Sequence, residues 1–262
     1  MIRVGVVGAA GRMGATVCRA VEADPELDLV AAVDPAGAGA EQGEGRPALS
    51  AERSALTAGG AEVVVDFSHI TAAVETLEWC ARAGLHVVMG TSGFGPDRID
   101  RAGQLFPGGH GGPNCIIVPN FALSAVLAVR FAELAAPWFE TAEVIELHHN
   151  RKVDAPSGTA MSTAERMGRA RAGAAWSAEP TRDEVLPGAR GALHDSGVRI
   201  HSVRMSGMVA HEEIILGAPG QTLTIRQDSY DRESYMPGVV MAVKAVPGLP
   251  GLTVGLERVL GI

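Results

Sequence analysis

The chain has 262 residues, which is enough for two modest domains that each bury a core. Its net charge of −8, the lack of any lysine- or arginine-rich run and the lack of an apolar stretch of about 18 residues argue against a nucleic-acid partner and a membrane span. Three separated cysteines, and an N-terminus that runs straight into a strand instead of a signal peptide, favour a reduced, cytoplasmic protein.

The first residues carry a pattern typical of a dinucleotide-binding fold. A short apolar strand is predicted over 2–7, and the glycines Gly8, Gly11 and Gly14 follow it before a helix over 15–23. Gly8 permits a tight turn, and Gly11 permits close approach of a pyrophosphate. Gly14 lets the helix pack closely on the strand. Because the glycines have a strand before them and a helix after them, the pattern predicts a nucleotide site.

The second predicted strand bears on the choice of cofactor. It covers 29–33 and ends in Asp34, about 20 residues past the last glycine, where an acid accepts the ribose hydroxyls of NAD. Asp34 would repel the 2′-phosphate of NADPH, whereas Arg12 in the glycine loop would attract it. We therefore expect use of both cofactors or a preference for NADH.

The rest of the first half alternates strands and helices. Strands are predicted over 63–68, 86–89 and 115–118, and helices over 72–83 (closed by Gly84) and 99–105. Segment 37–60 is predicted as a loop with a poorly formed helix, and 108–113 as a loop in which His110 is solvated. This alternation predicts an α/β fold with a doubly wound parallel sheet of the Rossmann type. Ligands bind at the carboxyl ends of such strands, where the chain places Gly8, Asp34, Phe67, Gly90, Thr91, Pro119 and Asn120.

The second half predicts a separate α+β domain with an open mixed sheet. Its predicted elements are a helix over 122–136, a strand over 142–148, a helix over 159–172, a loop over 174–190, and strands over 198–205, 212–217 and 221–227, with Gly220 in a hairpin turn. An open sheet needs a cover, so we expect it to form oligomer contacts. Segments 231–246 and 252–260 are expected to return to the first domain. The predicted domains are therefore 1–121 with 230–262 for dinucleotide binding, and 122–229 for substrate binding and oligomerisation.

A cluster of basic side chains between the predicted strand over 142–148 and the predicted helix over 159–172 is the strongest indication of function in the chain. It consists of His148, His149, Arg151 and Lys152. Ser157 is a favoured helix N-cap, and Gly158 lets a ligand approach the backbone closely. A helix start with nearby cations binds anions, and His and Lys move protons near neutral pH. The two adjacent histidines serve one site only if the strand has ended there, or if two ligands flank it. No metal site is expected, because His194, His201 and His211 lack ligand spacing.

These motifs resemble the dihydrodipicolinate reductases (4-hydroxy-tetrahydrodipicolinate reductases) of bacterial lysine biosynthesis, over essentially the whole chain. The matching segments are the glycine loop 8–14, Asp66-Phe67-Ser68, Gly90-Thr91-Ser92-Gly93, Pro119-Asn120-Phe121, 146–160, 204–211 and Asp231-Arg232. The resemblance implies NADH- or NADPH-dependent reduction of 4-hydroxy-tetrahydrodipicolinate, with loss of water, by a cytoplasmic homotetramer whose partner is this small dicarboxylate.

The resemblance also implies roles for particular residues. His148 is similar to the family's proton donor or acceptor, and Lys152 to its proton donor. Contacts to the substrate carboxylates are implied at His149, Ser157, Gly158 and Thr159. With the strand-end residue Phe67, the predicted cofactor contacts are Gly8, Ala9, Ala10, Gly11, Arg12, Met13, Asp34, Gly90, Thr91, Ser92, Val118, Pro119, Asn120 and Phe121.

Three positions depart from the family's pattern. Arg151 and Gln227 stand where the family usually has His, and Ile70 where it often has Pro. One alternative is therefore a diverged paralogue that reduces a related cyclic imine dicarboxylate. A different Rossmann enzyme, such as an amino-acid dehydrogenase acting on an imine, has no reason to carry segment 152–159. A non-catalytic nucleotide-binding protein would fit loss of His148 or Lys152, and neither is lost.

Overall fold

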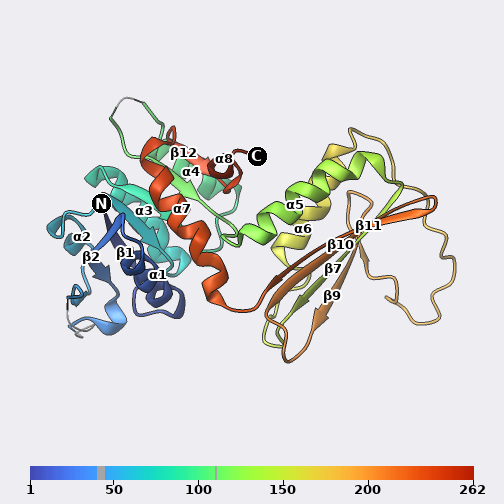
Figure 1. The fold of residues 1–262 in the computed structure, drawn as a ribbon, viewed down its shortest axis with the longest axis horizontal. Coiled ribbons are helices and arrows are strands. Elements are labelled where there is room, and N and C mark those ends of the chain that lie inside the picture. Colours follow the sequence, from blue (N-terminus) through green and yellow to red (C-terminus); the bar gives the residue numbers. More distant parts are fainter. Residues whose placement is uncertain (40–44, 110) are drawn as a thin grey trace. The chain divides into compact units, whose positions relative to one another are not determined.

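The computed structural model describes residues 1–39, 45–109 and 111–262, and the chain divides into two units. The first unit comprises Met1–Phe121 and Tyr235–Ile262. It is built on a seven-stranded parallel sheet with the order β12-β6-β5-β4-β1-β2-β3 (Figure 1). Its strands are β1 (Ile2–Val7), β2 (Leu27–Val33), β3 (Leu49–Ser50), β4 (Val63–Asp66), β5 (His86–Met89), β6 (Cys115–Ile117) and β12 (Leu252–Val254).

Helices cover both faces of this sheet. They are α1 (Arg12–Ala23), α2 (Ser54–Ala58), α3 (Ile70–Ala83), α4 (Pro96–Leu105), α7 (Met236–Ala245) and α8 (Glu257–Leu260), with 3₁₀ turns η1 (Pro35–Gly37), η3 (Arg232–Tyr235, at the junction with the second unit) and η4 (Val246–Gly248). Leu56 of α2, Leu77 of α3 and Ala102 of α4 share one core with Val64 and Val87 of the sheet. Helices α1 and α7 pack against each other and against strands β1 and β5. Because both faces are covered, the strands are mostly apolar instead of alternating.

The structure confirms the predicted doubly wound sheet and differs at its edges. Strand β3 lies in the segment predicted as a loop with a poor helix, and β12 pairs with β6 in the segment predicted only to return to this domain. Two or three residues are too few to show a periodicity, and pairing with a neighbour alone makes them strands. Residues 40–44 of that segment, and His110 with its predicted solvation, lie outside the described residues.

The second unit, Ala122–Ser234, holds a five-stranded mixed sheet with the order β11-β10-β7-β9-β8. Its elements are α5 (Leu123–Ala135), η2 (Ala136–Trp138), β7 (Thr141–His148), α6 (Gly158–Ala170), β8 (Ala192–Leu193), β9 (Arg199–Arg204), β10 (Ala210–Ala218) and β11 (Gln221–Ser229). The predicted hairpin is present, with Gly220 at φ 75° between β10 and β11. The short strand β8 was not predicted.

Helices α5 and α6 lie side by side against one face of this sheet (Figure 1). The core between them contains alternate strand residues, among them Val144 of β7 and Ile214 of β10. The same alternation brings Glu146 of β7 and Glu212 of β10 to this face. Those two positions pair directly across the strands, so two acids are buried at one point of the core.

Candidate active site

Strand β7 ends at His148, and the chain leaves the sheet in a turn that contains His149. The Lys152 amide donates to the His149 carbonyl at 3.1 Å, and the Arg151 amide donates to Nδ1 of His149 at 3.2 Å. Because the strand has ended, the two adjacent histidines are not forced to opposite faces of the sheet. The structure thus meets the condition under which both serve one site.

Glu146 holds the groups around this turn together. Its side chain is fully buried, and Nη1 and Nη2 of Arg204 each donate to its carboxylate at 2.7 Å. The amide of Ser157 donates to Oε1 at 3.1 Å, and Nδ1 of His148 lies 2.5 Å from Oε2. One carboxylate therefore connects the end of β7, the end of β9 and the start of α6.

The charge of Glu146 fixes the proton on His148. Burial acts to raise the pKa of Glu146, but hydrogen bonds from Arg204, Ser202 and His148 outweigh it and hold the pKa below its usual value. An ionised carboxylate only accepts hydrogen bonds, so Nδ1 of His148 carries the hydrogen in this contact. The other ring nitrogen, Nε2, is then left to exchange a proton with a ligand.

The surroundings of His148 favour its neutral form. Burial is the largest cause that lowers its pKa, and Lys152 and Arg204 act in the same direction. The contact with Glu146 opposes them without reversing the net direction. Burial thus lowers the pKa of His148 more than the neighbouring cations do.

Lys152 is oriented by an exposed partner. Its Nζ donates to both carboxylate oxygens of Asp154, at 2.9 and 2.7 Å, and this ion pair lowers the pKa of Asp154. The Asp154 carbonyl accepts from Nη2 of Arg204 at 2.7 Å, which ties the loop to the Glu146 assembly. Since the Asp154 side chain is 60% exposed, its attraction for Lys152 is screened by water, and a ligand carboxylate can compete for the ammonium.

Helix α6 begins as the sequence predicted. Ser157 is its N-cap, and the Ser157 hydroxyl accepts from the Ala160 amide at 3.2 Å. A Cβ placed on Gly158 would meet no described atom within 4 Å, so the backbone there is open to a ligand. The first turn of a helix carries N–H groups without intrahelical acceptors, and these favour anions. Gly158 and Thr159 occupy that turn, directly after the cap that Glu146 holds in place.

The first unit contains a pocket of about 520 Å³ at the carboxyl ends of β1, β2 and β4. Four of the predicted cofactor residues line it: Gly8, Gly11, Asp34 and Phe67. The lining also includes residues that were not assigned a cofactor contact from the sequence, namely Arg53, Ser68, His69 and Glu75. Arg53 directly precedes α2, Ser68 and His69 directly precede α3, and Glu75 lies on α3. Apart from Ser68, no local motif marks them.

Backbone contacts explain why the glycine loop has its spacing. Gly8 has φ 79°, and a Cβ there would lie 2.8 Å from the Phe67 carbonyl oxygen. A Cβ on Gly14 would lie 2.0 Å from the Gly8 carbonyl oxygen, so α1 packs on this loop only without a side chain at that position. Asp34 accepts from the amides of Ala10 and Ala36, at 3.0 and 2.9 Å, and so lies against the loop.

The other predicted cofactor residues follow the neighbouring strands. Gly90, Thr91 and Ser92 come directly after β5, and Val118, Pro119, Asn120 and Phe121 come directly after β6. The ring of Phe67 lies 5.5 Å from that of Phe121, and a Cβ on Gly90 would lie 2.3 Å from the Phe67 ring. The Thr91 hydroxyl donates to the buried Asp66 carboxylate at 3.0 Å. These loops are thus packed together at one edge of the sheet.

Two residues that organise the site around His148 and Lys152 were not predicted to be site residues. Glu146 and Arg204 lay inside matching segments but had no assigned role. A charged residue at an inward position of an otherwise apolar strand was the available signal for Glu146. Arg204 is 58 residues further along the chain, and only the pairing of β7 with β9 brings it to Glu146.

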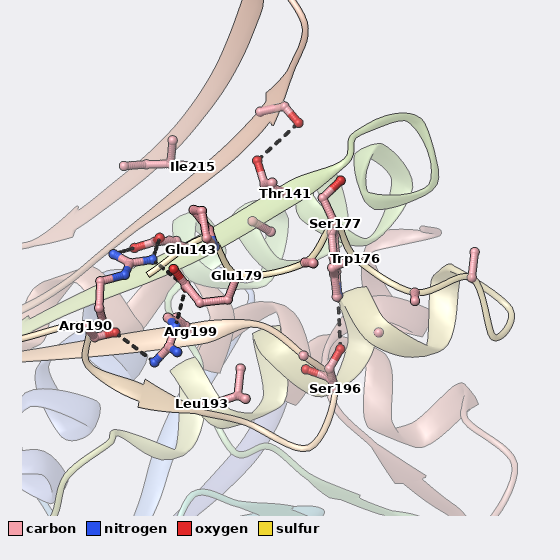
Figure 2. A pocket seen from close by; sticks show the side chains of 18 of the residues that line it. Thr141, Glu143, Trp176, Ser177, Glu179, Arg190, Leu193, Ser196, Arg199 and Ile215 are labelled. Carbon is pink, nitrogen blue, oxygen red and sulfur yellow. Dashed lines mark hydrogen bonds and ion pairs between the residues drawn. The ribbon is translucent and has the colours of Figure 1, made fainter. Parts of the chain in front are cut away.

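A cavity beside the second sheet lies away from this chemistry. Its volume is about 1020 Å³, and its lining residues include neither His148 nor Lys152. Figure 2 shows four of its charged side chains paired with one another: Arg190 contacts Glu143 and Glu179, and Arg199 donates to Glu179 at 2.8 Å. Because these charges already have partners, the cavity offers less to a charged ligand than the site around Glu146 or the pocket of the first unit.

The described part of the chain offers neither a metal-binding group nor a membrane-spanning helix. It contains no group of three or more His, Cys, Asp or Glu side chains arranged to hold a metal ion. Within the same residues, no helix is both long enough and apolar enough to cross a membrane.

Comparison with known families gives two matches that together cover most of the chain. The family model described as "Dihydrodipicolinate reductase, N-terminus" matches residues 2–121. The one described as "Dihydrodipicolinate reductase, C-terminus" matches residues 124–260.

Individual relatives are similar over their whole length. The proteins named 4-hydroxy-tetrahydrodipicolinate reductase from Corynebacterium urealyticum and Thermobifida fusca are each 48% identical to this chain, with all of both chains covered. The structure of a dipicolinate-bound dihydrodipicolinate reductase from a Paenisporosarcina species has a TM-score of 0.87 at 34% identity, over 98% of this chain and 99% of that one. An amine dehydrogenase from Mycobacterium smegmatis has a TM-score of 0.65 at 16% identity, over 98% and 95% of the chains, and shares the fold alone.

Proposed function

The chain belongs to the dihydrodipicolinate reductase family, and we infer that it reduces 4-hydroxy-tetrahydrodipicolinate in lysine and diaminopimelate biosynthesis. The substrate is a small ring with two carboxylates, an imine and a hydroxyl. Loss of water gives a conjugated imine, addition of a hydride to the ring gives an enamine, and a proton completes the product. The net reaction consumes one hydride and one proton and releases one water, so the protein must hold two carboxylates and supply an acid.

The assembly around Glu146 is the observation that carries this function. It orients His148 with Nδ1 toward a permanent acceptor, so that Nε2 is available to the substrate. The same carboxylate holds the amide of Ser157, and thereby the first turn of α6, at a fixed place beside the histidine. In this proposal Lys152 provides positive charge and the proton for the enamine, and the neutral His148 exchanges a proton through Nε2.

We assign the anion clamp to His149, Ser157, Gly158 and Thr159. The helix start supplies N–H groups, Thr159 supplies a hydroxyl, and Lys152 exchanges its exposed partner Asp154 for a substrate carboxylate. A similar solved structure is a reductase with dipicolinate bound, and that planar dicarboxylate resembles the substrate ring.

The pocket in the first unit fits a nicotinamide dinucleotide. The glycine loop excludes side chains where a pyrophosphate would lie, and the carboxylate of Asp34 lines the same pocket. When bound, such a cofactor supplies the hydride. Asp34 accepts ribose hydroxyls, and the exposed Arg12 compensates only part of its repulsion of a 2′-phosphate. We propose that NADH binds at least as tightly as NADPH.

The departures from the family's pattern do not favour another substrate. Arg151 is exposed, and its amide alone contacts His149. Gln227 is buried in the second sheet, where it lies 3.4 Å from the hydroxyls of Ser124 and Ser229. Identity of 48% to reductases over their full length argues against a diverged paralogue. The presence of both His148 and Lys152 argues against a non-catalytic protein.

A cytoplasmic homotetramer is part of the proposal. The face of the second sheet opposite α5 and α6 is uncovered at Leu193, which is 62% exposed, and a second copy would bury such a face. All three cysteines are buried and unpaired, which suits a reducing compartment. Light scattering of the purified protein would give the oligomer number.

A coupled assay tests the function directly. The hydroxy-tetrahydrodipicolinate is generated in situ, and the absorbance of NADH and of NADPH is followed in separate reactions. We expect substrate-dependent oxidation of NADH at least as efficient as that of NADPH, with competitive inhibition by pyridine-2,6-dicarboxylate. Absence of substrate-dependent oxidation with either cofactor would contradict the proposed function.

A further inference from the structure

A second carboxyl group is buried behind the anion clamp. Glu212 of β10 is 3% exposed and pairs across the sheet with the fully buried Glu146 on β7. On its other side it pairs with Gln227 of β11. Two adjacent acids in an apolar core are unfavourable if both are ionised. Glu146 has Arg204 to balance its charge, and Glu212 has no such partner among the interactions that the structure describes.

The hydrogen bonds of Glu212 indicate which form it takes. Its Oε1 lies 2.6 Å from the hydroxyl oxygen of Thr163, which also lies 3.0 Å from the carbonyl oxygen of Thr159. A threonine hydroxyl has one hydrogen, and a carbonyl oxygen only accepts. Both contacts are hydrogen bonds only if Thr163 donates to Thr159 and Glu212 donates to Thr163. That arrangement requires a proton on the Glu212 carboxyl group.

The charges around Glu212 favour the same form. Burial is the main cause that raises its pKa to about 7, the contact with Thr163 opposes this increase, and Glu146 adds to it. Of the charged residues of α5 and α6, Arg130 and Arg166 both pair with Glu133. Strand β9 contributes Arg204, which is bound to Glu146, and β11 contributes Asp228, which is bound to His211 and Arg226. His148 lies beside Glu146 at the end of β7.

We propose that Glu212 is a positioning residue that works in its protonated form, and that loss of this proton weakens binding of the dicarboxylate. An ionised Glu212 would take the Thr163 hydrogen for itself, and the Thr159 carbonyl in the first turn of α6 would lose the bond from this hydroxyl. It would also place a second negative charge beside Glu146, behind the site that receives the substrate carboxylates. This inference rests on the proposed function, since it assumes that the clamp binds a dicarboxylate.

The affinity for pyridine-2,6-dicarboxylate at pH 6 and pH 9 provides the test. Its carboxylates stay ionised over this range, so changes in affinity come from the protein. We expect the wild-type protein to bind it about tenfold more weakly at pH 9 than at pH 6. In Glu212→Gln an amide replaces the protonated carboxyl and never ionises, so the change should shrink to less than about twofold. Equal pH dependence in the two proteins would overturn the proposal.

A second pair of variants guards against misfolding of Glu212→Gln. Thr163→Ser keeps the hydroxyl and should keep the tenfold change, whereas Thr163→Val removes the relay and should weaken binding already at pH 6. Infrared difference spectra of the wild-type protein between pH 6 and pH 9 should show loss of a protonated carboxyl band that Glu212→Gln lacks. Absence of that band at pH 6 would also overturn the proposal. Turnover of the wild-type protein at pH 6 tests the proposed function separately.

Discussion

The two units build their sites from different kinds of interaction. In the first unit the glycine loop of the pocket depends on close backbone contacts that a side chain would block. Gly8 turns the chain, and Gly14 leaves space for the Gly8 carbonyl. In the second unit the site is formed by charges, with the buried Glu146 at its centre and Arg204 and His148 around it. A site that depends on close backbone packing should be sensitive to added side-chain volume. A site that depends on charged groups should be sensitive to isosteric loss of a charge or of a hydrogen bond. The five predictions below test this contrast.

The largest effect is expected from loss of a charge in the second unit. Lys152→Ala removes the ammonium beside His148, and kcat should fall by about 10²–10⁴ because such contributions act mainly in the transition state. NADH affinity should stay nearly unchanged, since the nucleotide pocket belongs to the other unit. Arg151→Ala is the matched control, because it removes a neighbouring exposed cation and should change kcat only a few-fold. A near-normal kcat in Lys152→Ala would exclude the assigned role.

Added side-chain volume in the glycine loop of the first unit should have the next largest effect, on stability and on NADH binding. Gly14→Ala places a Cβ 2.0 Å from the Gly8 carbonyl oxygen, and neither backbone can yield easily. We expect the free energy of unfolding to fall by about 3 kcal/mol, with at least about tenfold weaker NADH binding. Gly103→Ala in α4 is the control, because its nearest described neighbour would be 3.7 Å away. That variant should be more stable by about 0.5–1 kcal/mol, and equal denaturation curves for the two variants would contradict the packing argument.

The buried acid of the second unit should make stability depend on pH. The folded-state pKa of Glu212 is raised to about 7 from a reference value of 4.5, so its contribution to stability is fully present below pH 4.5 and is lost as pH rises to about 7. The difference of about 2.5 corresponds to about 3 kcal/mol. Urea unfolding at pH 4.5 and pH 8 should therefore show Glu212→Gln gaining about that much relative to wild type. Parallel pH dependence of the two proteins would show that Glu212 is ionised in the folded state.

A smaller effect is expected where the clamp offers a hydroxyl. Thr159→Val keeps the shape of the side chain and removes one hydrogen bond to a charged ligand, which costs roughly 1.5–3 kcal/mol, or about ten- to a hundredfold in affinity for pyridine-2,6-dicarboxylate. Ser162→Ala removes an exposed hydroxyl elsewhere on α6 and should have no effect. Calorimetry that gives the same affinity for wild type and Thr159→Val would show that this hydroxyl does not hold the carboxylate.

The smallest effect concerns the one acid of the predicted cofactor set. Asp34→Ser should shift the preference toward NADPH by about tenfold, or roughly 1.4 kcal/mol, because it removes the charge that repels a 2′-phosphate. Fluorescence titration with both cofactors at low and moderate salt measures this ratio. If the ratio of the two affinities stays the same, Asp34 does not contact the ribose, and the cofactor lies differently in the pocket.

Local patterns in the sequence determined most of the elements and the two regions of chemistry. The glycine loop, Asp34 and the basic segment 148–159 are contiguous or follow a known spacing, because a turn, a helix start or a strand end is decided by neighbouring residues. The N-cap at Ser157 and the helix closed by Gly84 were found for the same reason.

Tertiary structure alone decided which distant residues meet. Strands β3 and β12 exist because a neighbouring strand pairs with them, and the contact of Glu146 with Arg204 depends on the register of β7 against β9. The same holds for Glu212, whose proton follows from burial, from Thr163 and from a second acid across the strands. The sequence identifies a titratable residue, but whether that residue is ionised depends on its exposure to solvent and on its partners in the folded protein.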